Sequence, residues 1–204
     1  MKTAHKPLRD PDGTRDTILD AAFQEMHRYG FQAASLSNIL AKTGLTKGAL
    51  YHHFPTKSDL GIAVIEEVVR EGLDAMVFEP LRESADPFGT LIEIVRRKGQ
   101  KAEEESVRLG CPLNNLMQEM SPIDDTFKQH LNEVLTAWQD SVADAFERAK
   151  KQGRVRGDVD CRATALFIVS SWEGCVGVAK NLQSVKDFSL CMRQLENYIA
   201  SLAA

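Results

Sequence analysis

The sequence predicts an all-α protein in which a small three-helix N-terminal domain precedes a larger helical domain, with about nine helices in total. Apolar residues recur three and four positions apart along nearly the whole chain, most clearly over residues 18–26 and 127–146. No segment of comparable length alternates with a period of two, as a half-buried strand would. The 204 residues suffice for one small and one larger core, and we expect domains at 1–60 and 61–204.

The charge distribution singles out the N-terminal quarter of the chain. The net charge is −4, but residues 1–60 carry eight Lys and Arg against six Asp and Glu, net +2. The remainder carries 17 Lys and Arg against 23 Asp and Glu, net −6. Any attraction to nucleic acid must therefore be local to the N-terminal domain. Residues 1–13 predict a mobile, mildly basic arm. An ordinary disordered terminus is the favoured interpretation of this arm, and an arm that contacts DNA is the alternative.

Composition and the cysteines exclude several classes of protein. No apolar run approaches the roughly 18 residues of a membrane span, and the N-terminus lacks a signal peptide, so we expect a cytoplasmic protein with no membrane partner. The four cysteines lie far apart, without CxxC or interleaved histidines, which predicts free thiols and no metal or cofactor. They are Cys111, Cys161, Cys175 and Cys191.

The segment 35–60 has the pattern of a helix-turn-helix. Ser35 can cap a short helix, and Gly44 is placed to end that helix in a left-handed conformation. Thr46 then caps a second helix over 47–53, so that only a tight turn separates the two. The second helix of such a motif enters the DNA major groove.

The residues of the second helix divide into an inner and an outer set. Leu50 and Phe54 should face inward, whereas Tyr51 and His52 should face outward. Small Gly48 and Ala49 beside cationic Lys47 let the backbone approach DNA, where free N–H groups suit a phosphate. Thr56-x-x-Asp59 is a capping box that opens a third helix, with Lys57 at its first position.

Residues 14–60 resemble the DNA-binding domain of the TetR (tetracycline repressor) family of transcriptional regulators. The likeness rests on Ile-Leu-x-Ala-Ala from Ile18, on Tyr-Gly-Phe from Tyr29, and on Gly-Leu-Thr-Lys-Gly-Ala-Leu-Tyr-His-His-Phe from Gly44, followed by Lys57 and Leu60. The resemblance implies that Thr46, Tyr51, His52 and Lys57 hold phosphates of a double-stranded operator. It also implies that Ser37, Asn38, Lys47 and Ala49 approach base edges.

The remaining two-thirds of the chain contains no catalytic motif. GxSxG, HExxH and phosphate-loop patterns are absent, so we do not expect an enzyme. A cysteine enzyme around Cys111 would need a nearby histidine or carboxylate as base, which the sequence around it does not offer. A further alternative is a helical module that binds a protein partner or nucleic acid non-specifically.

The last two predicted helices have more apolar surface than one core needs. Residues 162–182 are apolar on nearly all sides, and residues 188–202 form an amphipathic stripe. The resemblance implies that these helices build a four-helix interface of a homodimer. The alternative is that both helices complete the core of a monomer.

The resemblance also implies a cavity for a small-molecule effector behind the linking helix over 56–78. Candidates to line it are Leu91, Val95, Cys111, Leu113, Asn114, Met117, Trp138, Phe167 and Trp172. The expected function is therefore a ligand-responsive repressor that binds a palindromic operator as a dimer and is released by a small molecule or electrophile.

Cys111 raises a specific hypothesis about the release step. Gly110 and Pro112 place Cys111 at a helix N-terminus, where the dipole lowers a thiol pKa, and Lys98, Lys101 or Arg108 could add to the effect. The Gly-Cys pair at 110–111, followed by Asn-Leu and Glu, resembles the sensing domain of family members that respond to electrophiles or oxidants. The other interpretation, which is favoured, is a small buried residue at a helix junction.

Overall fold

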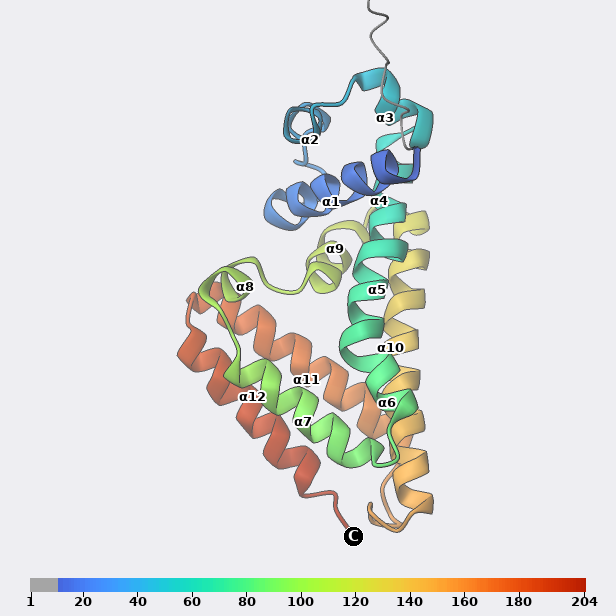
Figure 1. Ribbon diagram of the computed structural model, residues 1–204. Helices are drawn as coiled ribbons and strands as arrows, with labels where there is room; N and C mark the ends of the chain where they lie inside the picture. Colours follow the sequence, from blue (N-terminus) through green and yellow to red (C-terminus); the bar gives the residue numbers. More distant parts are fainter. Residues whose placement is uncertain (1–10) are drawn as a thin grey trace, which may run out of the picture. The chain divides into compact units, whose positions relative to one another are not determined.

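The computed structural model describes residues 11–204, and these residues form helices connected by short turns (Figure 1). Within them there is no β-strand, only one isolated bridge between Val155 and Ala203, which confirms the all-α prediction. The chain divides into two compact units, unit 1 ending at Val64 and unit 2 spanning Ile65–Ala204. Every helix among the described residues is too short or too polar to cross a membrane.

Unit 1 contains the three helices of the predicted N-terminal domain and the start of a fourth. They are α1 (Pro11–Tyr29), α2 (Leu36–Thr43), α3 (Lys47–His53) and α4 (Lys57–Ala63). α1 packs against the other three helices. The core between them contains Ile18, Ala22, Met26, Ile39, Leu50, Phe54 and Leu60, all buried, which is the inward face that helical spacing predicted.

The first helix begins earlier than the sequence indicated. α1 starts at Pro11, and proline is well suited to a first helical turn because its missing N–H has no partner there. The last three residues of the predicted arm at 1–13 therefore belong to the helix. The rest of that arm lies outside the described residues.

A helical segment that alternates between π and α winding begins at the last residue of unit 1 and continues into unit 2. It runs without a break through η1 (Val64–Val69), α5 (Arg70–Leu73), η2 (Asp74–Phe78) and α6 (Glu79–Glu83). Helices α7 (Pro87–Gln100), α8 (Glu104–Leu109) and α9 (Pro112–Met120) follow. The long helices come last: α10 (Asp125–Lys151), α11 (Cys161–Leu182) and α12 (Val185–Ala200).

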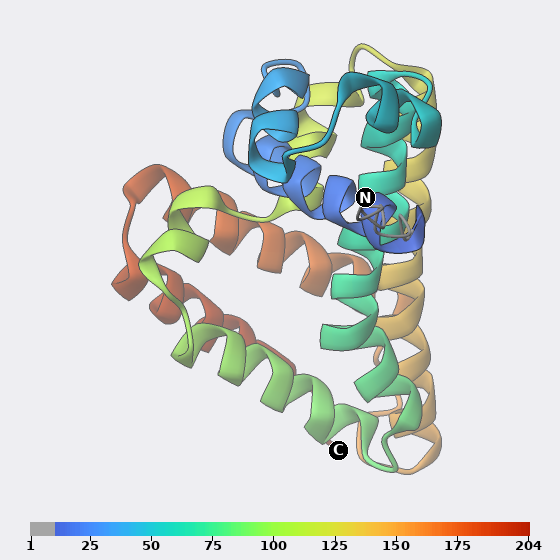
Figure 2. The ribbon, with the colours of Figure 1, turned by 45° about the horizontal axis from the view of Figure 1, so that its top comes forward.

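The long helices of unit 2 pack in a fixed order. α12 lies along α7, and α11 packs between α10 and α12, as both views show (Figures 1 and 2). Trp138 on α10 meets Trp172 on α11 edge to face, with ring centroids 5.6 Å apart. Both rings are buried with Phe127 and Phe146, so these aromatic residues are a large part of the core of unit 2.

The prediction that all four cysteines are free thiols is wrong for two of them. Cys175 on α11 and Cys191 on α12 form a disulfide, with Cα atoms 5.6 Å apart. They meet because α11 and α12 pack antiparallel, a proximity that the spacing of cysteines along the sequence does not reveal. Cys111 and Cys161 remain free.

Candidate DNA interface and sensing domain

The turn between α2 and α3 has the local geometry that the sequence predicted. Ser35 Oγ accepts from the N–H of Asn38 at the start of α2. Gly44 ends the helix with φ +66°, a left-handed conformation that strains most side chains, and its N–H donates to the Leu40 carbonyl at 2.9 Å. Thr46 Oγ1 then accepts from the Ala49 N–H at 3.2 Å and begins α3. Each end of the turn is thus fixed by a hydrogen bond.

α3 presents an apolar inner face and a polar outer face. Leu50 and Phe54 are buried, whereas Tyr51 and His52 are exposed, as predicted. Thr46 and Lys47 are also exposed, and the Lys47 ammonium lies 5.7 Å from the centre of the Tyr51 ring. A cation beside an aromatic hydroxyl gives this face two kinds of group suited to phosphate oxygens.

The start of α4 is fixed by the predicted capping box. Thr56 Oγ1 accepts from the Asp59 N–H at 3.0 Å, and Asp59 Oδ2 accepts from the Thr56 N–H at 2.9 Å. Lys57 Nζ donates to the Gln32 carbonyl at 3.0 Å and lies 5.0 Å from the centre of the Phe31 ring. The Lys57 ammonium is therefore held in place by the turn after α1.

A buried glutamate, which sequence reasoning missed, fixes α2 against α1. The Glu25 side chain accepts from Asn38 Nδ2 at 2.7 Å and from Lys42 Nζ at 3.0 Å. Burial alone would raise the pKa of Glu25, but these hydrogen bonds hold it below its usual value. The sequence feature that could have revealed this contact is a lone acidic residue on the apolar face of a predicted helix. Part of the Asn38 amide is thereby used inside unit 1, while Ser37 stays exposed.

One side of α11 and α12 exposes large apolar side chains. Phe167, Val178 and Leu182 on α11 are each more than half exposed, and Phe167 stacks edge to face on Tyr198 of α12 at 4.9 Å. Leu166 on α11 is also more than half exposed, whereas the exposed Leu190 of α12 lies beside α7. We call Leu166, Phe167, Val178, Leu182 and Tyr198 the apolar surface of α11 and α12. Trp172 and Leu195, in contrast, are buried within unit 2.

The structure places the predicted effector-binding residues in several parts of unit 2. Five of them belong to the packed core of unit 2: Leu91, Val95, Leu113, Trp138 and Trp172. Phe167 lies on the apolar surface instead, and Met117 borders a groove beside α10. Asn114 lies against α11, where its Nδ2 is 3.9 Å from the position a Cβ would take on Gly177.

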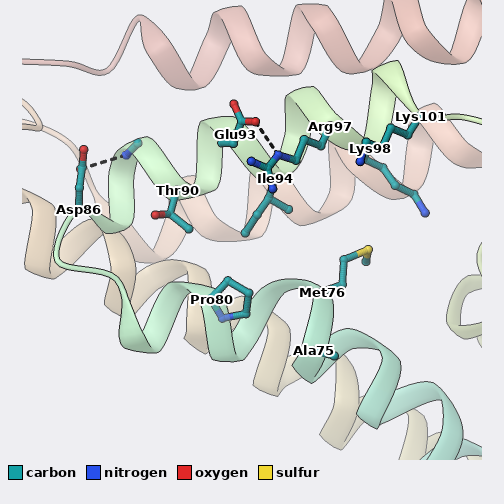
Figure 3. A pocket seen from close by; sticks show the side chains of 11 residues that line it. Ala75, Met76, Pro80, Asp86, Thr90, Glu93, Ile94, Arg97, Lys98 and Lys101 are labelled. Atoms are coloured by element: carbon teal, nitrogen blue, oxygen red, sulfur yellow. Dashed lines mark hydrogen bonds and ion pairs between the residues drawn. The ribbon is translucent and has the colours of Figure 1, made fainter.

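A pocket of about 870 Å³ lies between η2, α6 and α7 in unit 2. Met76, Pro80 and Ile94 provide its apolar wall (Figure 3). Lys98 and Lys101 provide cations at one end, whereas Arg97 is paired with Glu93 at 2.6 Å. None of the predicted effector residues lines this pocket. The prediction named mostly apolar residues, and most of these are buried in the core of unit 2.

Cys111 is the N-cap of α9, as predicted, but its thiol is not activated. Burial, together with the smaller effect of the Glu173 carboxylate, raises the pKa of Cys111 to about 12. The backbone N–H groups of Asn114 and Leu113 lower this pKa by less. Arg108 pairs with Glu105 at 2.6 Å instead of facing the thiol. The predicted lowering of the pKa is therefore wrong.

Glu173 is the residue beside Cys111 that sequence reasoning missed. It lies on α11, is 8% exposed, and neither carboxylate oxygen has a hydrogen-bond partner of ordinary geometry among the described residues. Burial raises the pKa of Glu173 to about 7, against the opposing effects of Cys111 and the Lys98 charge. The expectation that no carboxylate lies near Cys111 is thus wrong, because α11 brings one from a distant part of the sequence.

The comparisons with known proteins agree on one family. Residues 18–64 match the family described as "Bacterial regulatory proteins, tetR family", and residues 88–195 match "Tetracyclin repressor-like, C-terminal domain". The transcriptional regulator AcuR of Cereibacter sphaeroides is 29% identical over 177 residues, 86% of this chain and 81% of AcuR. The HTH-type transcriptional repressor DhaR of Mycobacterium sp. is 23% identical over 169 residues, 79% of this chain and 80% of DhaR.

Solved structures show the same fold. A TetR regulatory protein from Rhodobacter sphaeroides superposes with a TM-score of 0.80 at 26% identity, covering 91% of this chain and 98% of that one. The reduced form of NemR from E. coli superposes with a TM-score of 0.82 at 18% identity. The match covers 94% of this chain and 97% of NemR. Together with the capped helix-turn-helix, these matches show that the chain belongs to the TetR family of DNA-binding transcriptional regulators.

Proposed function

We propose that this chain is a ligand-responsive repressor that binds a palindromic operator as a homodimer and is released when a small molecule occupies unit 2. The observation that carries the proposal is the α2–α3 turn, in which capping at Ser35, Gly44 and Thr46 leaves one face of α3 exposed. A repressor of this bacterial family acts on the chromosome, so we place it in the cytoplasm.

The DNA contacts divide into positioning and specificity sets. Thr46, Tyr51, His52 and Lys57 are proposed to hold phosphates, which fix the register of the protein on the duplex. Base edges would be approached by Ser37, Asn38, Lys47 and Ala49. Asn38 can do so only with the part of its amide that Glu25 does not use.

The homodimer is proposed to form through the apolar surface of α11 and α12. Phe167 and Val178 are each more than half exposed in the single chain, and exposed apolar patches commonly mark protein interfaces. A two-fold axis through this surface would pair each helix with its own copy. A symmetric dimer reads two half-sites about 34–36 Å apart in successive major grooves.

The effector is proposed to act by population shift. A ligand that binds better to a dimer whose recognition helices no longer match the groove spacing lowers operator affinity by that difference. The pocket between η2, α6 and α7 is the proposed site, and Lys98 and Lys101 favour an anionic compound with an apolar part. We propose that Asn114 and Met117 contribute only if the ligand extends towards α9.

Covalent release through Cys111 is the second form of the effector hypothesis. Its specific support is the position of Glu173, a buried carboxylate beside the thiol that could accept its proton, although the same negative charge raises the pKa of the thiol. Treatment with N-ethylmaleimide should then release DNA from the wild type and leave Cys111→Ser bound. Equal loss of binding in both proteins would leave the non-covalent pocket as the effector site.

The decisive experiment selects bound duplexes from a random pool with purified protein. We expect a palindromic site whose affinity falls steeply as salt rises, because each neutralised phosphate releases counterions. Lys57→Ala should weaken all sites alike, whereas Lys151→Ala, an exposed lysine of unit 2, serves as the matched control. Selected sites without two-fold symmetry, or binding insensitive to salt, would favour a non-specific binding module instead.

A further inference from the structure

Three potential metal ligands meet on unit 2, apart from the DNA interface and the pocket between η2, α6 and α7. Glu66 comes from η1, and His130 and Glu133 come from α10. His130 and Glu133 are three residues apart, so their side chains share one face of α10. One donor atom from each of the three residues lies within 4.8 Å of the others.

The position of His130 is the second observation that points to a ligand. Its Nδ1 lies 2.7 Å from Glu66 Oε1, yet this nitrogen is buried and has no hydrogen-bond partner of acceptable geometry among residues 11–204. Such an unsatisfied buried polar atom is costly in a folded protein. A cation bound by both the imidazole nitrogen and the carboxylate oxygen would satisfy both atoms, because each would contribute a lone pair. The two atoms would first have to move apart to roughly 3.3 Å, the separation of two ligands around a tetrahedral ion.

We propose that Glu66, His130 and Glu133 bind a divalent first-row transition metal ion, for which Zn²⁺ is the natural probe. One imidazole and two carboxylates match the donors that Zn²⁺ accepts at about 2.0–2.2 Å. The imidazole selects against Mg²⁺ and Ca²⁺, which prefer oxygen ligands alone. With neutral His130, the two carboxylates balance the charge of the ion, and three protein ligands leave a position for water or an exogenous ligand.

A neighbouring side chain already holds one of the ligands. Gln129 Nε2 donates to Glu133 Oε1 at 3.2 Å, which leaves the second carboxylate oxygen for the ion. Hydrogen bonds of this kind orient ligating carboxylates and strengthen metal binding. The bound ion would tie η1, the first turn of unit 2, to α10 and would therefore stabilise unit 2 in proportion to metal concentration.

The test measures metal binding directly, without DNA or effector. Chelator-treated protein is titrated with Zn²⁺ by calorimetry and with Co²⁺ by visible absorption, and we expect one ion per chain. His130→Ala, Glu66→Gln and Glu133→Gln should each weaken Zn²⁺ binding by at least about tenfold, since loss of even an outer-shell partner costs that much. Glu71→Gln, an exposed carboxylate on the same helical segment, and His53→Ala are the controls.

The outcomes separate this site from the others in the chain. Circular dichroism checks that each variant is folded, and the two glutamine variants are isosteric should His130→Ala misfold. Thiolate-to-cobalt charge transfer that disappears in Cys111→Ser or Cys161→Ser would assign the metal to a cysteine and overturn the proposal. Unchanged Zn²⁺ affinity in Glu66→Gln and His130→Ala, or no binding by the wild type, would show that the pair is only an ion pair.

Discussion

Glu173→Gln should remove a pH dependence from the stability of unit 2. Glu173 is 8% exposed, and burial raises its pKa from 4.5 to about 7. The folded state therefore binds a proton between these two pH values that the unfolded state has released. Because the folded state holds more protons, stability falls as pH rises through this range and levels off above about pH 7. Glutamine cannot ionise, so the variant should not show this fall.

The size of the effect follows from the pKa difference. A shift of this size is worth about 3 kcal/mol at 1.36 kcal/mol per unit. Between pH 5 and pH 8 it corresponds to a loss of about 2.5 kcal/mol in the wild type relative to Glu173→Gln, because part of the effect lies below pH 5. This is a large fraction of the 5–15 kcal/mol typical of a folded domain.

The assay uses the two tryptophans of the chain. Both Trp138 and Trp172 lie in unit 2, and Trp172 is adjacent to Glu173. Guanidinium unfolding followed by tryptophan fluorescence at pH 5 and pH 8 gives the free energy of unfolding for each protein. Glu83→Gln, an exposed glutamate on α6, is the control and should parallel the wild type. Parallel pH dependence in wild type and Glu173→Gln would refute a raised pKa for this carboxyl.

Three further predictions concern other parts of the chain. With a pKa of about 12, the half-buried Cys111 in a Cys161→Ser background should react with N-ethylmaleimide at pH 8 at least about tenfold more slowly in the folded protein than in guanidinium, because only the thiolate attacks. Equal rates would contradict the raised pKa. Phe167→Glu should give a folded monomer by light scattering, whereas a persistent dimer would place the interface elsewhere. Asn38→Ala should destabilise unit 1 by about 1–3 kcal/mol in thermal unfolding, since Glu25 loses a donor, and a change within error would show that the hydrogen bond contributes little.

The helix-turn-helix could be predicted residue by residue because its determinants are local. The cap at Thr46, the left-handed Gly44 and the box at Thr56 each depend on residues within four positions along the chain. The inward positions of Leu50 and Phe54 follow from helical period alone. The role of Glu25 was not predicted because its partners Asn38 and Lys42 belong to another helix.

Unit 2 was less predictable because its important contacts join residues far apart in sequence. Glu173 meets Cys111, and Cys175 meets Cys191, only after α11 has packed on its neighbours. α11 is apolar on nearly all sides, so its pattern did not distinguish the buried face of Trp172 from the exposed face of Phe167. Periodicity identifies which face of a helix is buried only when the opposite face is polar.

The π-helical segment η2 has a consequence for how this chain tolerates changes in length. A π turn bonds residue i to i+5, so it holds one more residue than an α turn in the same place. Deleting one residue within Asp74–Phe78 would convert the segment to α winding while α6 keeps its present face towards α7. The same deletion within α10, which is regular over its whole length, would turn every later side chain by about 100° around the axis. By the same argument, a one-residue deletion in η1 or η2 should leave unit 2 folded, whereas one within α10 should not.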